Sequence, residues 1–290
     1  MISFGLPEDT QIGRVQLRTA DLKRALLFYC GVLGLRIVEK SEGNALLTAA
    51  ETGPVLIELS EDRAAPPRPP DTTGLYHTAI RFPSRRDLAQ ALQRLVRNNY
   101  PLQGAADHLV SEALYLSDPE RNGVELYADR PRAQWVWNNG EVVMSTEALN
   151  LSDLLATIKG EAPAASPPSE TDLGHIHLQV ADLNEAERFY HKFLGLAVTQ
   201  RSYPGALFFS AGGYHHHIAV NTWAGPDAPP ANSVGLISYR LKVPSADILS
   251  FLGERAPVFG YEAQMVKLSK EMEILEITDP NGNTLEIASV

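Results

Sequence analysis

The chain has 290 residues, of which 44% are hydrophobic and 21% charged, and its formal net charge is −10. We expect a cytoplasmic globular protein with one large core or two smaller ones, because neither a membrane span nor a leader peptide is evident. The negative charge disfavours nucleic acid and anionic membranes as partners. The lone cysteine, Cys30, excludes an internal disulfide and a thiolate metal cluster.

The first part of the chain predicts a strand, a helix and three further strands, in that order. Residues 12–19 alternate as in a strand, Asp21 can cap a helix, and short strands separated by turns are expected near 35–40, 45–49 and 55–59. The same order then recurs. Its predicted elements are a strand at 76–82, a helix at 85–98, and strands around 114–116 and 124–127.

The second half of the chain repeats the first with a shift of 161 residues. VQLRTADLKRALLFYCGVLGL from Val15 matches IHLQVADLNEAERFYHKFLGL from Ile176, and the same shift carries Glu125 onto Glu286. We therefore predict an α+β fold of four βαβββ modules that pair into two open, cup-shaped β-barrels. Modules one and two occupy residues 1–130, a linker covers 131–171, and modules three and four occupy 172–290.

Histidines and carboxylates recur at equivalent positions of the four modules. The first strands offer Arg14, His77, His175 and Ser238, and the last strands offer Glu58, Glu125, the run His215, His216 and His217, and Glu286. Two imidazoles and one carboxylate can bind a ferrous, manganous or zinc ion and leave coordination positions open. Such sets are therefore the candidates for a metal site.

Modules two and three together hold a complete set, His77, Glu125 and His175. We expect these modules to form the cup that binds the metal, because the cation Arg14 opposes metal binding in module one. Modules one and four would then form a metal-free cup in which Arg14, Glu58 and Glu286 make an ion network. The alternative pairs module one with two and module three with four.

Four stretches resemble a known family: GHIHLQVADLNEAERFYHKFLGL, LYHTAIRFPS, DPERNGVELYADRP and GGYHHHIAVNTW. They are similar to the vicinal oxygen chelate superfamily, and most of all to its extradiol ring-cleaving dioxygenases of the catechol 2,3-dioxygenase type. The resemblance covers nearly the whole chain except the linker. In that family the second His and the Glu usually come from the fourth module, whereas here they lie in the second.

The resemblance implies an Fe(II)-dependent oxidoreductase that incorporates dioxygen into a catechol-like aromatic diol, with iron bound by His77, Glu125 and His175. It also implies catalytic roles for three residues. Tyr115 would hydrogen-bond the substrate, His216 would transfer protons, and His108 would be a further histidine on the substrate side. Which of the three consecutive histidines faces the metal stays open at this point.

Two other functions are compatible with the same modules. One is a glyoxalase-type metalloisomerase that uses Ni(II) or Zn(II), and the other is a metal-free protein that binds an aromatic ligand. Mn(II) is an alternative to Fe(II) in the dioxygenase. The expected partners are a small aromatic substrate and dioxygen, and a homo-oligomer is an alternative to a monomer because cups can also close between chains.

Overall fold

The computed structural model describes residues 4–51, 53–269 and 272–289, and it contains the four expected modules. Module one comprises β1 (Gln11–Thr19), α1 (Leu22–Leu26) with its π-helical continuation η1 (Leu27–Val32), β2 (Arg36–Ser41), β3 (Asn44–Thr48) and β4 (Ile57–Glu61). Module two comprises β5 (Gly74–Phe82), α2 (Arg85–Arg97), β6 (Gly104–Asp107), β7 (Ser111–Ser117) and β8 (Gly123–Asp129).

The second half of the chain has the same order of elements. Module three comprises β12 (Asp172–Gln179), α4 (Leu183–Glu187) with η3 (Arg188–Phe193), β13 (Ala197–Gln200), β14 (Ala206–Ser210) and β15 (Ile218–Asn221). Module four comprises β16 (Gly235–Val243), α5 (Ala246–Phe259), β17 (Ala263–Lys267), β18 (Glu273–Thr278) and β19 (Thr284–Ser289).

The helix after each first strand begins at a side-chain cap. Asp21 accepts a hydrogen bond from the backbone N–H of Arg24, as predicted, and its duplicate Asp182 accepts from Asn184 and Glu185. These caps satisfy backbone donors that a helix start leaves free. The capping aspartate therefore marks where the first strand has ended and the helix begins. Counting back from it gives the position of each side chain on the strand.

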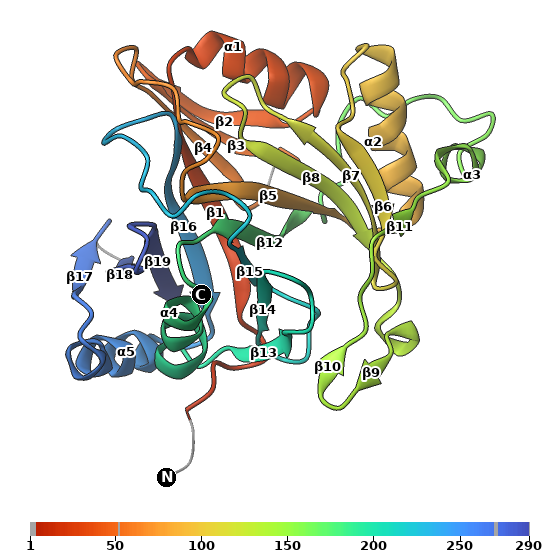
Figure 1. Ribbon diagram of the computed structural model, residues 1–290. Coiled ribbons are helices and arrows are strands. Elements are labelled where there is room, and N and C mark those ends of the chain that lie inside the picture. Colours follow the sequence, from red (N-terminus) through yellow and green to blue (C-terminus); the bar gives the residue numbers. More distant parts are fainter. Residues whose placement is uncertain (1–3, 52, 270–271, 290) are drawn as a thin grey trace.

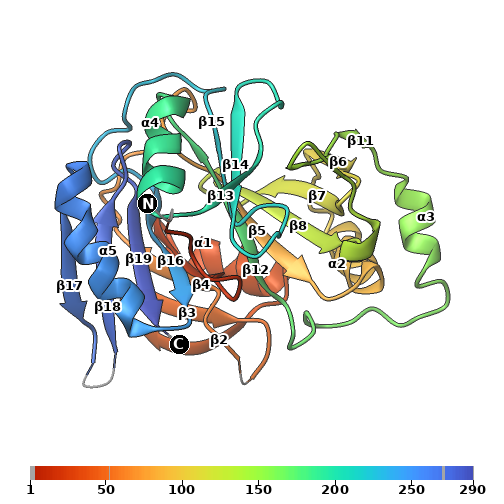
Figure 2. The same cartoon turned by 90° about the horizontal axis from the view of Figure 1, so that it is seen from below.

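The strands form two large sheets, and each sheet takes one module from each half of the chain. One sheet has the order β17-β18-β19-β16-β1-β4-β3-β2, and the other has β6-β7-β8-β5-β12-β15-β14-β13 with one short strand added beside β6. The modules join through antiparallel pairs, β1 with β16 and β5 with β12. The structure thus confirms the α+β fold and the pairing of module two with three and one with four. Figure 1 and Figure 2 show the curled sheets with the helices at the periphery.

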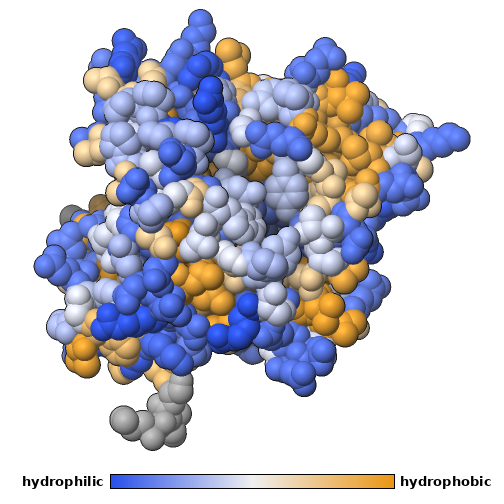
Figure 3. Space-filling view, in the orientation of Figure 1, coloured by the Kyte–Doolittle hydropathy of each residue, from blue (hydrophilic) through white to orange (hydrophobic). Residues whose placement is uncertain are grey.

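The apolar core lies between the sheets and their helices, on one face of each strand. In β12 the side chains of Ile176 and Leu178 belong to this core, and so do Ile218 and Val220 of the neighbouring strand β15. Alternation places the residues between them on the opposite, concave face. Hydrophilic side chains cover most of the face seen in Figure 3, and hydrophobic ones gather there in limited patches. Because the apolar core takes the other face of each strand, the concave faces can hold polar residues such as His175.

The segment between the halves is more ordered than a simple linker. It contains the 3-10 turn η2 (Arg132–Gln134), a hairpin of β9 (Trp137–Asn138) and β10 (Glu141–Val142), the strand β11 (Glu147–Ala148) and the helix α3 (Leu151–Ala156). β11 pairs with β6 and so extends the sheet of modules two and three. Across the ranges that the structure describes, no helix has both the length and the apolar character needed to cross a membrane.

Candidate metal centre

Three neighbouring strands bring the predicted ligands together on the concave face of the sheet formed by modules two and three. His77 lies on β5, Glu125 on β8 and His175 on β12, and β5 is the strand between the other two. Ala79 of β5 lies opposite Glu125 on one side and His175 on the other. His77 is two residues before Ala79 and shares its face of the strand. The small Ala79 side chain therefore leaves room for three ligands to converge.

The three ligand atoms are close enough to share one ion. Glu125 Oε2 lies 3.0 Å from His77 Nε2 and 3.0 Å from His175 Nε2, and the two Nε2 atoms are 3.3 Å apart. Metal–ligand bonds of about 2.1 Å at right angles place neighbouring ligand atoms about 3.0 Å apart. Two imidazoles and one carboxylate in this arrangement are the donor set of the facial triad of non-haem Fe(II) enzymes. The residues thus fit a divalent metal ion.

Burial favours the protonation states that such an ion requires. His77, Glu125 and His175 are at most 6% exposed. Burial lowers the pKa of His175 to about 4, although Glu125 opposes this shift. Burial opposes ionisation of Glu125, but the imidazoles of His175 and His77 hold its pKa well below the usual value. A neutral imidazole beside a carboxylate is the ligand state for a divalent cation.

A cavity of about 220 Å³ opens above these ligands. Aromatic and apolar side chains make much of its wall, and they come from several elements: Tyr76, Val110, Met144, Tyr203, Phe208 and Trp223. No lysine or arginine lines it within the described part of the chain. The lining is therefore suited to a flat, uncharged ring that reaches the metal ligands with its polar edge.

Tyr115 and His108, both predicted from the family resemblance, form a hydrogen-bonded pair on the cavity wall. His108 Nδ1 lies 2.7 Å from the carbonyl of Ser145, so this nitrogen carries the proton, and Tyr115 Oη lies 2.6 Å from His108 Nε2. The Tyr115 hydroxyl consequently donates to His108. Burial and the nearby Glu125 raise the pKa of Tyr115 well above its usual value, so the phenol keeps its proton.

The structure separates the three consecutive histidines. His216 lines the cavity, with its ring centroid 4.1 Å from that of His175. His215 turns to Asp129, and His217 accepts a hydrogen bond from the backbone of Ala211. His216 is therefore the member that reaches the candidate metal centre.

The equivalent place in the other sheet is filled by an ion network, as predicted. Arg14 pairs with Glu58 and lies 3.3 Å from Glu286, and Arg240 lies 2.5 Å from the same Glu286. The shift of 161 residues places Arg240 at the position of Ala79 and Arg14 at that of His175. Two guanidinium groups thus occupy the space where modules two and three leave room for an ion.

Several cavity residues were not identified from the sequence. Met144, Ser145 and Thr146 come from the segment between the halves, and Tyr76 and Trp223 stand at the ends of strands. Asp129 was also missed, although alternation offered a signal for it. Asp129 is four residues after Glu125 on β8 and so shares its face of the sheet.

Comparisons with known proteins give the same relationship in both halves of the chain. A model of the glyoxalase/bleomycin resistance protein/dioxygenase superfamily matches residues 11–126 and 172–287. The catechol-2,3-dioxygenase of Bacillus subtilis (strain 168) is 44% identical over 263 residues, which cover 89% of this chain and 91% of that protein. This relationship confirms the predicted class of enzyme, an oxidoreductase that incorporates dioxygen.

Solved structures with low sequence identity share the fold. A Bacillus subtilis protein provisionally assigned as a dioxygenase has a TM-score of 0.70 at 14% identity, covering 99% of this chain and 86% of that one. Glyoxalase I from Zea mays has a TM-score of 0.60 at 14% identity, covering 97% of this chain and 92% of that one. The family match in both halves and the relative with 44% identity show that the chain belongs to the glyoxalase/bleomycin resistance protein/dioxygenase superfamily.

Proposed function

We propose that this protein is an Fe(II)-dependent extradiol dioxygenase that opens the ring of a catechol-like aromatic diol. The observation that carries the proposal is the convergence of His77, Glu125 and His175 at the base of an aromatic-lined cavity. The relative with 44% identity is a catechol-2,3-dioxygenase, which supports the same reaction class. Fe(II) held by these three residues would supply Lewis-acid and redox chemistry to the diol and to dioxygen.

The cavity supports an uncharged ring as the substrate. Phe208, Tyr203 and Trp223 can contact the faces and edges of an aromatic ring, while the metal ligands lie at the base. A carboxylate on the ring would enter a cavity whose described lining has no lysine or arginine and already holds the anion Glu125. Burying such a charge without a partner is costly. We therefore expect catechol and its alkyl derivatives to be preferred over carboxylated catechols.

His216 is placed to take the proton that a catechol hydroxyl releases on binding. Its ring lines the cavity, and burial, reinforced by neighbouring imidazoles, lowers its pKa well below the usual value. The neutral ring therefore offers a lone pair at neutral pH and can return the proton to the ring-opened product. The proton moves from the substrate hydroxyl to a nitrogen of His216 and later leaves with the product.

Tyr115 and His108 would stabilise the substrate oxygen that becomes anionic. The Tyr115 hydroxyl now donates to His108, and a substrate oxygen in the cavity is an alternative acceptor for the same proton. Because burial keeps this phenol protonated, Tyr115 acts as a donor toward an oxyanion. His108 is held by the Ser145 carbonyl and so keeps Tyr115 in place.

A glyoxalase-type isomerase finds less support. That function would require modules one and two to form one cup in which two carboxylates bind the metal. Glu58 of module one lies in the other sheet and pairs with Arg14, so it is not near Glu125 of module two. A metal-free binding protein is disfavoured by the donor set at the base of the cavity.

Oxygen uptake by the purified protein tests the proposal. Protein stripped of metal is reloaded anaerobically with Fe(II), Mn(II), Ni(II) or Zn(II), and is then given oxygen with catechol, 3-methylcatechol, 3,4-dihydroxybenzoate, hydroquinone or methylglyoxal hemithioacetal. We expect one oxygen molecule consumed per catechol, a ring-opened product, and a preference for Fe(II) and for the uncharged diols. Isomerisation of the hemithioacetal without oxygen uptake would establish the glyoxalase function instead. Failure to retain any of the four metals would refute the metal-dependent functions and favour the metal-free binding protein.

A further inference from the structure

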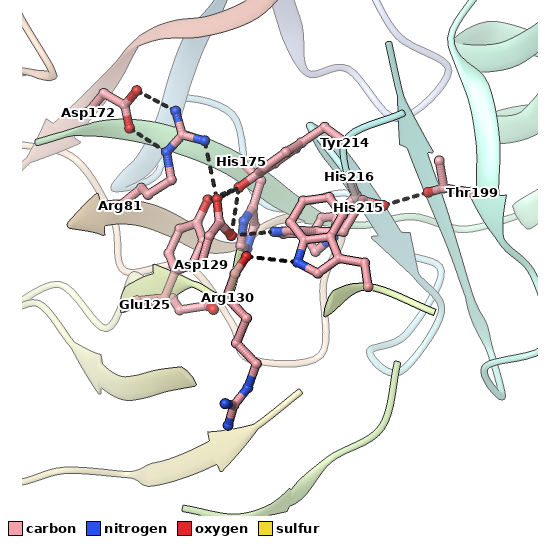
Figure 4. A network of polar contacts seen from close by, with 12 residues as sticks. Arg81, Glu125, Asp129, Arg130, Asp172, His175, Thr199, Tyr214, His215 and His216 are labelled. Atoms are coloured by element: carbon pink, nitrogen blue, oxygen red, sulfur yellow. Dashed lines mark hydrogen bonds and ion pairs between the residues drawn. The ribbon is translucent and has the colours of Figure 1, made fainter. Parts of the chain in front are cut away.

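His215 and Asp129 continue the hydrogen-bond chain that begins at His216. His216 Nδ1 lies 2.8 Å from His215 Nδ1, and His215 Nε2 lies 3.0 Å from Asp129 Oδ1 (Figure 4). The chain thus joins a carboxylate on β8 to two adjacent imidazoles in the loop before β15. Within the described residues, no hydrogen-bond partner occupies His216 Nε2, the other nitrogen of the cavity-lining ring.

The direction of these hydrogen bonds follows from the carboxylate. Burial opposes ionisation of Asp129, but His215, Arg81 and Tyr214 hold its pKa below the usual value. An ionised carboxylate only accepts, so His215 Nε2 carries a proton. When His215 has a single ring proton, its Nδ1 must accept, and His216 Nδ1 must donate. His216 then presents the lone pair of Nε2 to the cavity.

Asp129 is held so that this direction is maintained. Arg81 Nη1 donates to Asp129 Oδ2 at 3.3 Å, and the Tyr214 hydroxyl lies 3.0 Å from the same oxygen. Arg81 is itself bound by both oxygens of Asp172, at 2.9 and 2.6 Å. Figure 4 shows Arg81 between the two carboxylates and Tyr214 beside Asp129. The carboxylate therefore has fixed donors on each side.

Packing also fixes the two imidazole rings. The His215 side chain is 1% exposed, its ring lies between Trp135 and Tyr214 at centroid distances of 5.2 and 4.1 Å, and its backbone carbonyl accepts from Thr199. The ring of His216 packs against Phe208 at 5.0 Å. Neither ring is free to rotate and exchange its nitrogens without disturbing these contacts.

We propose that His215 and Asp129 are positioning residues that set the ring tautomer of His216, with the proton on Nδ1 and the lone pair of Nε2 facing the substrate. The proposal rests on the proposed function for its effect on turnover, since it specifies which nitrogen of His216 accepts the substrate proton. When His216 becomes an imidazolium, its Nδ1–H still donates to His215, and the Asp129 carboxylate stabilises the positive charge through that ring.

The tautomer can be measured without turnover. We expect heteronuclear NMR of the ring nitrogens, in Zn(II)-loaded protein with isotope-labelled histidine, to place the His216 proton on Nδ1. In Asp129→Asn the new amide N–H can donate to His215 Nε2, which reverses both hydrogen bonds and moves the His216 proton to Nε2. A His216 proton on Nε2 in the unmodified protein would overturn the proposal, as would an unchanged tautomer in both Asp129→Asn and His215→Gln.

Two variants of His215 separate the two contacts of its ring. In His215→Asn the amide oxygen occupies the place of Nδ1 and can still accept from His216, whereas in His215→Gln the amide reaches Asp129 but leaves His216 Nδ1 without its acceptor. We expect kcat to fall about 10²- to 10⁴-fold in His215→Gln and Asp129→Asn, with metal content and KM unchanged. His215→Asn should stay within about tenfold of the unmodified protein. Equal losses in both His215 variants would contradict the assigned direction.

A double-variant cycle tests whether Asp129 acts through His216. Adding Asp129→Asn to His216→Ala should cause no further loss of kcat, because residues that act as one unit are not additive. A further loss of the same size as in the single variant would mean a merely structural role for Asp129. If the unmodified protein turns over no catechol while NMR still shows the Nδ1 tautomer, the proposed function fails and the positioning role stands.

Discussion

Truncating His77 to alanine should abolish retention of the metal on dialysis, while the same truncation at its duplicate, Ser238, should leave retention intact. His77 Nε2 lies 3.0 Å from Glu125 Oε2 and 3.3 Å from His175 Nε2. Ser238 lies in the other sheet, where its hydroxyl is 2.8 Å from Glu286 and 3.3 Å from Gln16, beside the Arg240–Glu286 ion pair. Loss of His77 leaves two ligand atoms of three, whereas loss of Ser238 leaves Glu286 with its arginine partners.

The size of the effect can be worked out for Mn(II), which is stable in air. Loss of a group that merely supports a ligand costs about 10- to 100-fold in metal affinity, so loss of a ligand should cost at least about 100-fold. At 100 times the dissociation constant, binding stabilises the unmodified protein by about 2.7 kcal/mol, but after a 100-fold loss only by about 0.4 kcal/mol. With a shift of about 2 to 4 °C per kcal/mol, Mn(II) should raise Tm by about 5 to 11 °C in the unmodified protein and by under about 2 °C in His77→Ala.

Differential scanning calorimetry with and without Mn(II), combined with metal analysis after dialysis, measures both quantities. The reasoning would be refuted by a full metal equivalent in His77→Ala, or by loss of metal in Ser238→Ala. Calorimetry without metal controls for folding, because both variants should then show a single cooperative transition. A His77→Ala protein that fails to fold would be replaced by His77→Gln, which keeps the polarity and most of the volume.

Three further changes should give separate outcomes. Arg240→Met leaves the buried carboxylate of Glu286 with weaker compensation and should lower the free energy of unfolding by about 3 kcal/mol in chemical denaturation, without changing metal content. A side chain at Gly123 would meet the Tyr76 carbonyl on β5 and lie 2.9 Å from His77 Cβ, whereas one at Gly104 meets nothing within 4 Å. Gly123→Ala should therefore reduce both the free energy of unfolding and the metal content. An equal effect of Gly104→Ala would contradict this. In metal-free protein the pKa of His175 is about 4 in the folded state and 6.5 for a histidine that is not buried, as in the unfolded chain. The unfolded state therefore binds the proton more tightly, and the free energy of unfolding decreases as the pH falls from 6.5 toward 4. His175→Gln should flatten this part of the curve of unfolding free energy against pH, and a curve parallel to the unmodified protein would contradict that assignment.

Much of the fold follows from short-range signals in the sequence. Asp21 and Asp182 mark the starts of their helices because a carboxylate can accept from the first backbone N–H groups, whatever the rest of the chain does. The strand before each helix shows an alternation of apolar and polar residues, which can be recognised from the local sequence alone. The π-helical turns at 27–32 and 188–193 were not predicted, although each contains a phenylalanine, Phe28 or Phe189, that is buried in the core.

The candidate site also has one part that the sequence predicts and one part that it does not. His77, Glu125 and His175 could be selected because the repeat aligns them with Ser238, Glu286 and Arg14, so a complete set stands out beside incomplete ones. The contact between Asp129 and His215 joins residues that are 86 positions apart, and no local pattern indicates it. The same holds for the contact between Ser145 and His108, which lies beside the pairing of β11 with β6.

The exchange of modules between the two sheets has a consequence for biosynthesis. His77 and Glu125 are translated in the first half of the chain, but His175 follows only after the segment between the halves. β1 acquires its antiparallel partner β16 even later. A nascent chain released before module three therefore presents two of the three predicted ligands on an unfinished sheet edge, and the ligand set is complete only after module three has been made. Binding of a metal ion would then indicate that modules two and three have been made and have paired.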